Sequence, residues 1–176
     1  MFWLKSGLFA VGLGMSFVYA IIPPLARDLG LSEIQASFIF SLSAVAWAMT
    51  SAPWGRASDK YGRRNIAILG YIGYSISMII LILPIYLADK NILSAAFVFP
   101  LLILGRTIYG LLGSATRPAS FAYLADITPK NKRTKKFARF ESNFLLGTLV
   151  GPLLGGYLYL FSAFAPFLFF YILGIV

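Results

Sequence analysis

Five stretches of this chain are long, apolar and poor in charge, and they restrict its fold more than any other feature. A helix needs about 20 residues to cross a bilayer core, and each stretch is close to that length. The bilayer core offers the backbone no hydrogen-bond partners, so runs of this length are expected to be helices. We therefore predict an all-α integral membrane protein. The predicted spans are residues 7–25, 34–53, 65–87, 93–115 and 137–159.

The C-terminal part adds a sixth span to this prediction. Residues 142–176 carry no charge and are too many for one span of about 17–25 residues. We therefore expect a turn near residues 162–166 and a further helix after it. Residues 167–176 are too few for a full crossing, so the prediction is a six-helix unit over residues 1–176 whose sixth helix is incomplete.

Charged residues are scarce and unevenly placed. Hydrophobic residues make up 59% of the chain and charged residues 12%, which excludes an ordinary soluble domain. The net charge of +9 does not indicate a nucleic-acid partner, because the cations are sorted by loop and do not form one patch. They occupy alternate connections, a pattern that predicts a cytoplasmic N-terminus. The two basic connections contain Arg56, Lys60, Arg63 and Arg64, and then Lys130, Lys132, Arg133, Lys135, Lys136 and Arg139.

The chain contains neither cysteine nor histidine. It therefore lacks disulfides, the usual soft metal ligands and the commonest general base. No paired carboxylates or activated nucleophile are recognisable, so we expect no enzyme, no metal and no cofactor. The first apolar run exceeds the core of a signal peptide, which has about 7–15 residues, and we predict that it is retained as a span.

The connection after the second apolar run has the pattern G-x-x-x-D-K-x-G-R-R, from Gly55 to Arg64. We predict a tight cytoplasmic turn there, with Gly55 and Gly62 permitting close packing or positive φ where helices end. Asp59 can accept hydrogen bonds from Arg63, Arg64 or a helix N-terminus, which would latch one conformation. A basic anchor that only sets orientation, with an incidental Asp, explains the same residues.

Arg106 interrupts the fourth apolar run. A charge inside a span costs ~2.5–3.5 kcal/mol on insertion scales unless it is paired or hydrated, so Arg106 is a candidate functional residue. The alternative is an arginine that extends to the interface, but apolar residues on both sides place Arg106 well inside the span.

The fifth span contains G-x-x-x-G-P-x-x-G-G, from Gly147 to Gly156. Gly147, Gly151 and Gly155 recur every fourth residue and form a bare stripe that another helix backbone can approach closely. Pro152 frees a backbone carbonyl and permits a kink. A general glycine packing stripe explains the three glycines alone, whereas the ten-residue pattern is more specific.

Two carboxylates lie near the basic connections. Glu141 precedes Gly147 by about two helical turns, and a buried carboxylate at this position could carry a proton. The cations just before Glu141 favour the alternative of a surface acid at a helix N-terminus. Asp126 follows the fourth span, where a solvated acid is one interpretation.

Taken together, these patterns resemble the signatures of the major facilitator superfamily of transporters. The decapeptide is similar to the loop signature between spans two and three, with Lys60 where the family more often has Arg. Arg106 resembles the arginine of R-x-x-x-G in span four, with Tyr109 where Gln is usual. Residues 147–156 resemble the span-five motif of proton-coupled antiporters in this family.

This resemblance implies the N-terminal half of a transporter that has two six-span halves and works by alternating access. The expected activity is export of small organic solutes or drugs in exchange for protons, across a bacterial cell membrane. The missing C-terminal half, or a second copy of the chain, would complete the solute site. Spans one and four would line the cavity, and spans three and six would face the lipid bilayer.

The resemblance also implies roles for individual residues. Arg106 would take part in proton coupling, and Asp126 would pair with Arg63 of the loop. The stripe from Gly147 to Gly156 would pack on span eight of the second half and seal the outer side. The first span lacks the carboxylate that many drug antiporters of this family have, so the proton carrier is left open. Expected cavity-wall residues are Tyr19, Phe17, Asn143 and Tyr109.

Two alternatives to transport remain at this stage. One is a six-helix scaffold or partner subunit, with the glycine stripe binding a helix of another protein. The other is an inactive fragment of a longer protein.

Overall fold

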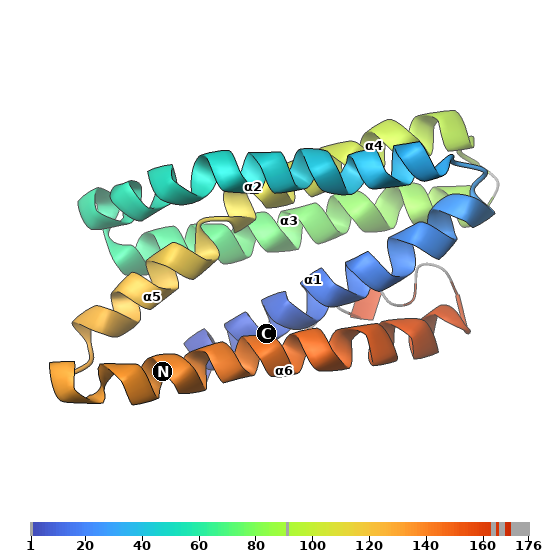
Figure 1. The fold of residues 1–176 in the computed structure, drawn as a ribbon. Coiled ribbons are helices and arrows are strands. Elements are labelled where there is room, and N and C mark those ends of the chain that lie inside the picture. Colours follow the sequence, from blue (N-terminus) through green and yellow to red (C-terminus); the bar gives the residue numbers. More distant parts are fainter. Residues whose placement is uncertain (1, 91, 163–164, 166–167, 170–176) are drawn as a thin grey trace.

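The computed structural model is a bundle of long helices (Figure 1). It describes residues 2–90, 92–162, 165, 168 and 169, and this part of the chain contains no strand, which confirms the all-α prediction. The elements are α1 (Phe2–Asp28), α2 (Glu33–Tyr61), α3 (Arg63–Asp89), α4 (Ala95–Ile108), a π-helix η1 (Tyr109–Gly113), α5 (Thr116–Asp126), a 3-10 helix η2 (Lys130–Lys132) and α6 (Arg133–Tyr159).

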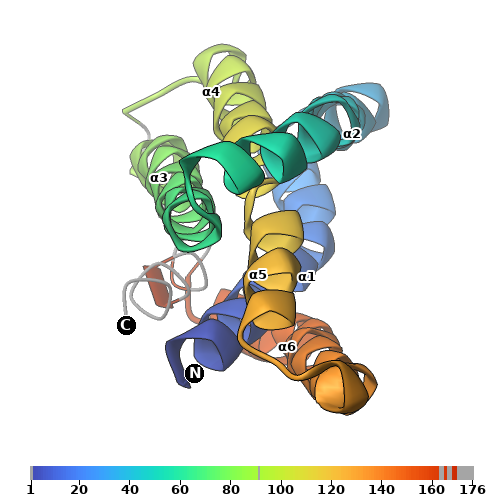
Figure 2. The same ribbon diagram turned by 90° about the vertical axis from the view of Figure 1, so that its left-hand side faces the viewer.

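The helices run along the same axis in alternating directions (Figure 1). α1, α3 and α6 run one way, and α2 and the α4–α5 segment run the other way. α1 packs mainly against α6, while α3 packs against α4, η1 and α5, as the end view in Figure 2 also shows. The core lies between these groups and includes Phe17 of α1 and Met78 of α3, both fully buried.

Four stretches of the described chain are long and apolar enough to cross a membrane. They are Ser6–Asp28, Glu33–Tyr61, Arg63–Ala88 and Ala96–Asp126. α6 has a comparable length of 27 residues, but its first part is strongly basic. α6 ends at Tyr159, as predicted, whereas the expected turn near residues 162–166 and the sixth span fall mainly outside the described residues.

The junction between α2 and α3 corrects the prediction of a ten-residue turn. α2 continues through Gly55 and Asp59 to Tyr61, and α3 begins at Arg63. Only Gly62 leaves the helical path, with φ 96°, a conformation that favours glycine. A change from apolar to charged side chains does not break a helix, and no proline lies between Pro53 and Gly62, so the polar end of α2 extends beyond the apolar run.

The fourth span is also more complex than predicted. The expected helix at residues 93–115 ends as α4 at Ile108, passes through η1 and turns before α5 (Figure 1). Pro118 contributes to this break because it has no N–H to donate to the carbonyl of residue 114. α2 hydrogen-bonds to the irregular segment: Trp54 Nε1 donates to the Leu111 carbonyl at 2.6 Å, and Thr50 Oγ1 donates to the Gly110 carbonyl at 3.2 Å.

Candidate functional site

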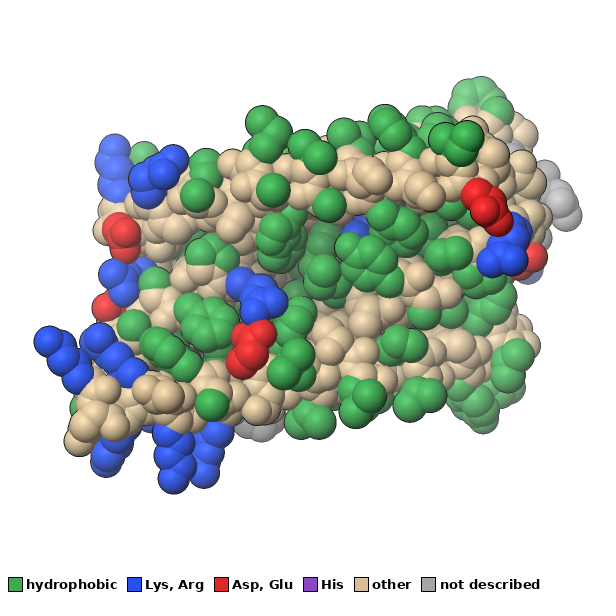
Figure 3. Space-filling view, in the orientation of Figure 1, with side chains coloured by type: hydrophobic (Ala, Val, Ile, Leu, Met, Phe, Trp, Pro, Cys, Tyr) green, Lys and Arg blue, Asp and Glu red, His purple; other side chains and the backbone are tan. Residues whose placement is uncertain are grey.

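A pocket of about 150 Å³ lies where α1, α2, α4 and η1 meet. Its lining consists of Met15, Tyr19, Ser43, Ala44, Trp47, Arg106 and Tyr109. Tyr19 and Ala44 are exposed, so the pocket opens to the surface of the chain. Figure 3 shows this face hollowed between α2 and α1, with a basic side chain among hydrophobic ones in the hollow.

Arg106 is the charged residue of this pocket and is 1% exposed. Its guanidinium carbon lies 4.9 Å from the ring centroid of Tyr109, 5.4 Å from that of Tyr19 and 5.6 Å from that of Phe40. A cation at such distances from aromatic faces gains cation–π attraction. None of the three guanidinium nitrogens makes a hydrogen bond of good geometry with a described residue, although the Tyr19 side chain lies close to the guanidinium.

Aromatic packing holds the pocket walls together. Tyr19 of α1 stacks on Phe40 of α2, with ring centroids 4.7 Å apart and planes inclined by 17°. Trp47 packs on Tyr109 at 5.3 Å, and Tyr109 meets Tyr74 of α3 edge to face at 6.1 Å. These ring pairs join α1, α2, α3 and η1 around Arg106, so the pocket is part of the core packing.

The sequence predicted only part of this wall. Tyr19 and Tyr109 do line the pocket, but Phe17 is buried in the core, and Asn143 is half-buried on α6 and is not part of the lining. The contribution of α2 was missed. The sequence feature that could have indicated it is one helical face with aromatic and small residues at spacing i, i+3, i+4 and i+7. That face consists of Phe40, Ser43, Ala44 and Trp47.

A second site lies at the basic end of the bundle. Arg63 Nη1 donates to Asp126 Oδ1 at 2.8 Å and to the Ala122 carbonyl at 2.8 Å, and Arg63 Nη2 lies 3.0 Å from Asp59 Oδ1. The predicted contact between Arg63 and Asp126 is therefore present. One guanidinium connects the end of α2, the start of α3 and the end of α5.

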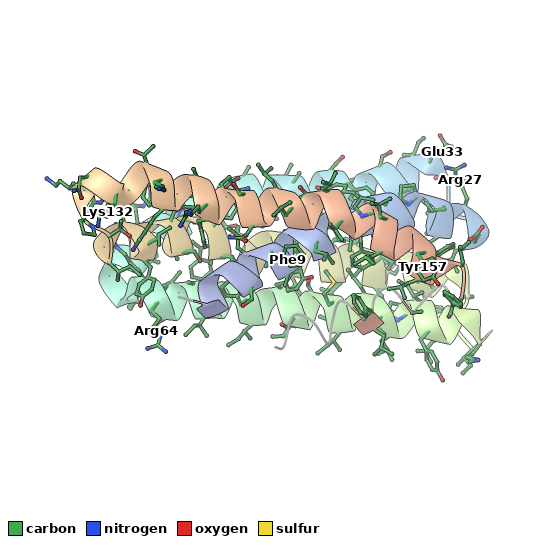
Figure 4. The ribbon with its side chains drawn as sticks, turned by 90° about the horizontal axis from the view of Figure 1, so that it is seen from below. Phe9, Arg27, Glu33, Arg64, Lys132 and Tyr157 are labelled. Atoms are coloured by element: carbon green, nitrogen blue, oxygen red, sulfur yellow. The ribbon has the colours of Figure 1, made fainter. Side chains whose placement is uncertain are left out.

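The neighbours of Arg63 in the decapeptide are less involved. Lys60 lies 5.3 Å from the ring centroid of Tyr61, and Arg64 is exposed. Gly55 is helical, and its nearest potential contact is Pro118 Cβ, which would lie 4.0 Å from an added Cβ. Figure 4 shows Arg64 and Lys132 at one end of the bundle and Arg27 and Glu33 at the other, so the two basic connections share an end.

A third charged pair lies between α5 and α6. Arg117 Nη2 donates to Glu141 Oε1 at 2.6 Å, and the side chains are 35% and 32% exposed. Arg117 also lies 4.5 Å from the Phe144 ring centroid, and Glu141 Oε2 is buried without a hydrogen-bond partner. Glu141 lies about two turns after the start of α6, so it is not at the helix N-terminus, and its side chain is partly exposed.

The glycine stripe of α6 faces α1 of the same chain. Gly147, Gly151 and Gly155 are buried, and a Cβ added at each would meet atoms of α1, including backbone atoms of Phe9 and Leu13. This corrects the expectation that the stripe is free for span eight or for a helix of another protein. Gly156 faces elsewhere, and no heavy atom of a described residue lies within 4 Å of an added Cβ there. The helix passes through Pro152 without ending.

Comparisons with known proteins agree with these signatures. Residues 6–176 match the family model described as Major Facilitator Superfamily. The chain is 33% identical over 167 residues to the class B tetracycline resistance protein of Escherichia coli, covering 93% of this chain and 38% of that protein. It is 27% identical over 175 residues to the quinolone resistance protein NorA of Staphylococcus aureus, covering 99% of this chain and 42% of that protein. The chain therefore spans about two-fifths of the length of these relatives.

Proposed function

This chain belongs to the major facilitator superfamily, and from that premise we propose that the intact protein is a proton-coupled antiporter that exports small organic solutes. The observation that carries the proposal is Arg106, a buried charge within a membrane-spanning helix that lines a pocket open to the surface. Intramembrane charges are rare and face the interior of a bundle or a water-filled cavity. The family consists of transporters, which favours transport over catalysis.

The proposed protein has a second six-helix half, or a second copy of this chain, facing the open pocket. The chain covers 38% and 42% of two relatives, which leaves room for such a half in proteins of this kind. Exposed apolar residues on α2, including Phe38 and Val45, would be covered by the second half. Rocking of the halves about the pocket would then expose it to each side in turn.

α3 is proposed to face lipid. Between residues 68 and 83, its exposed residues follow helical spacing and are all apolar, which suits contact with acyl chains. They are Ile68, Ile72, Ile76, Ile79 and Leu83.

We assign the Arg63 cluster the role of a conformational latch at the cytoplasmic end. Arg63 holds Asp59 and Asp126 together, so the ends of α2 and α5 stay close while this contact persists. These pairs are largely exposed, and each contributes only about 0–1 kcal/mol, so they can break and reform during a cycle. Lys60 and Arg64 add positive charge that keeps this end, and with it the N-terminus, in the cytoplasm.

Glu141 is proposed as the proton carrier, with Arg117 as its partner and Arg106 as the residue that couples it to the solute. Glu141 Oε2 has no hydrogen-bond partner in the described part of the chain, so a proton can be added there without breaking the contact between Oε1 and Arg117. The rigid pair formed by α1 and the Gly147, Gly151 and Gly155 stripe would carry this site as one unit.

The test is transport by the full-length protein in proteoliposomes that contain a pH-sensitive dye. Tetracycline and norfloxacin are suitable first solutes, because the two relatives are named for resistance to tetracycline and quinolones. We expect an imposed proton gradient to drive solute movement and added solute to release protons in the opposite direction. A protonophore should abolish accumulation. Solute movement that ignores the gradient would reject antiport, and no solute movement would favour a non-transporting scaffold.

A further inference from the structure

We propose that the Arg106 pocket binds the carboxylate group of an amphipathic organic anion. This names the solute class of the proposed transporter, and it rests on that proposed function for its biological meaning. The binding chemistry stands on the described residues of the pocket alone.

The first argument is that Arg106 has no counter-ion among the residues that the structure describes. An arginine side chain stays protonated in proteins and has five N–H donors. The three guanidinium nitrogens of Arg106 make no hydrogen bond of good geometry within the described part of the chain, although the side chain is 1% exposed. The ion pairs present among the described side chains join other arginines to Asp59, Asp126 and Glu141. A buried charge without a partner is unfavourable, so the site favours an incoming anion.

The second argument is the geometry of the surrounding rings. Tyr19, Phe40 and Tyr109 approach the guanidinium carbon to between 4.9 and 5.6 Å from their centroids. Ring faces stabilise a cation, but they do not supply the oxygen acceptors that guanidinium N–H groups need. A planar carboxylate matches the planar guanidinium with two parallel hydrogen bonds.

The third argument concerns the rest of the ligand. The pocket measures about 150 Å³, whereas one water needs ~10–15 Å³, so it holds more than a single water. Its wall is mainly apolar and aromatic, with Met15, Ala44 and Trp47 beside the charge. Such a wall favours an organic body attached to the carboxylate over a hydrated inorganic anion.

The experiment measures binding to the purified full-length protein in lipid nanodiscs by calorimetry. The probes are benzoate, the nearly isosteric but neutral benzamide, and inorganic phosphate. We expect benzoate to bind at least about thirtyfold more tightly than benzamide, because loss of one partner of a buried charge pair has effects of this size. Equal affinity for benzamide, or phosphate binding as tight as benzoate binding, would overturn the proposal.

A variant pair assigns the effect to one side chain. Arg106→Gln should weaken benzoate binding by about thirtyfold or more and leave benzamide binding nearly unchanged. Arg56→Gln is the matched control, because it removes one exposed arginine of α2 outside the pocket and should bind benzoate like the wild type. Unchanged benzoate binding by Arg106→Gln would refute the site.

Binding and transport can fail separately. Benzoate binding requires no gradient and no turnover, so a protein that binds benzoate but moves no protons would refute antiport and retain the anion site. A protein that exchanges protons for solute but does not distinguish benzoate from benzamide would retain antiport and refute the anion site. If Arg106→Gln does not yield folded protein, the comparison of the three probes on the wild type still decides whether the protein binds a carboxylate selectively.

Discussion

Replacing Gly151 with alanine is expected to push α1 away from α6. An added Cβ at residue 151 would lie 3.1 Å from the backbone nitrogen of Phe17 and would overlap the Leu13 carbonyl oxygen and Ser16 Oγ. Two of these three contacts are backbone atoms, which cannot rotate away, so the helices must shift. Overpacking of this kind costs ~1–3 kcal/mol. Alanine also gains up to about 1 kcal/mol of helix propensity over glycine, which hides part of this cost.

Gly156→Ala provides the matched control because it adds the same methyl group to the same helix. An added Cβ at residue 156 has no heavy atom within 4 Å. Both variants gain the same helix propensity from alanine, so this gain does not affect their difference. The free energy of unfolding of Gly151→Ala should therefore be lower than that of Gly156→Ala by about 1–3 kcal/mol. Thermal unfolding of the purified protein, followed by tryptophan fluorescence, measures this difference. Equal stability of the two variants would refute the close α1–α6 approach.

Three further predictions follow from the polar contacts. Arg63→Gln should reduce transport strongly but lower the free energy of unfolding by only about 0–1 kcal/mol, because the partners of Arg63 are exposed. Lys132→Gln removes one positive charge at the same end of the bundle and should retain transport. Equal transport rates for the two variants would refute the latch. Glu141→Gln should uncouple solute movement from the proton gradient, and a retained pH response would exclude Glu141 as the proton carrier. Trp54→Phe should lower the free energy of unfolding by about 0.5–1.5 kcal/mol and speed hydrogen exchange around residues 110–115, because it removes the hydrogen bond to the Leu111 carbonyl. Unchanged exchange there would show that Trp54 does not stabilise the irregular segment between α4 and α5.

The helical fold and several site residues could be predicted because their causes are local in sequence. The length of each apolar run determines where a helix can cross a membrane. Arg106 stands out because a charge among apolar residues is costly. Gly62 was one of two candidates for a helix end, and the structure selects it over Gly55 because, of these two glycines, Gly62 is the one with positive φ.

Other features depend on contacts between distant segments and could not be predicted. A bare glycine stripe indicates close approach of a helix but does not say which one, and here it is α1, more than a hundred residues earlier. The break after Ile108 depends on Trp54 and Thr50 of α2 as much as on Pro118. The pairing of Arg117 with Glu141 requires α5 to turn toward α6, which follows from that break.

Water accessibility of the pocket tests the central claim most directly. The chain contains no cysteine, so single cysteines can be introduced without background from it. Ala44→Cys places a thiol on the pocket wall, and Ile79→Cys places one on the exposed apolar face of α3. In membranes, a water-soluble thiosulfonate should label Ala44→Cys, with protection by bound solute, and should leave Ile79→Cys unlabelled. Labelling of Ile79→Cys with an inert Ala44→Cys would contradict a solute pathway along the Arg106 face.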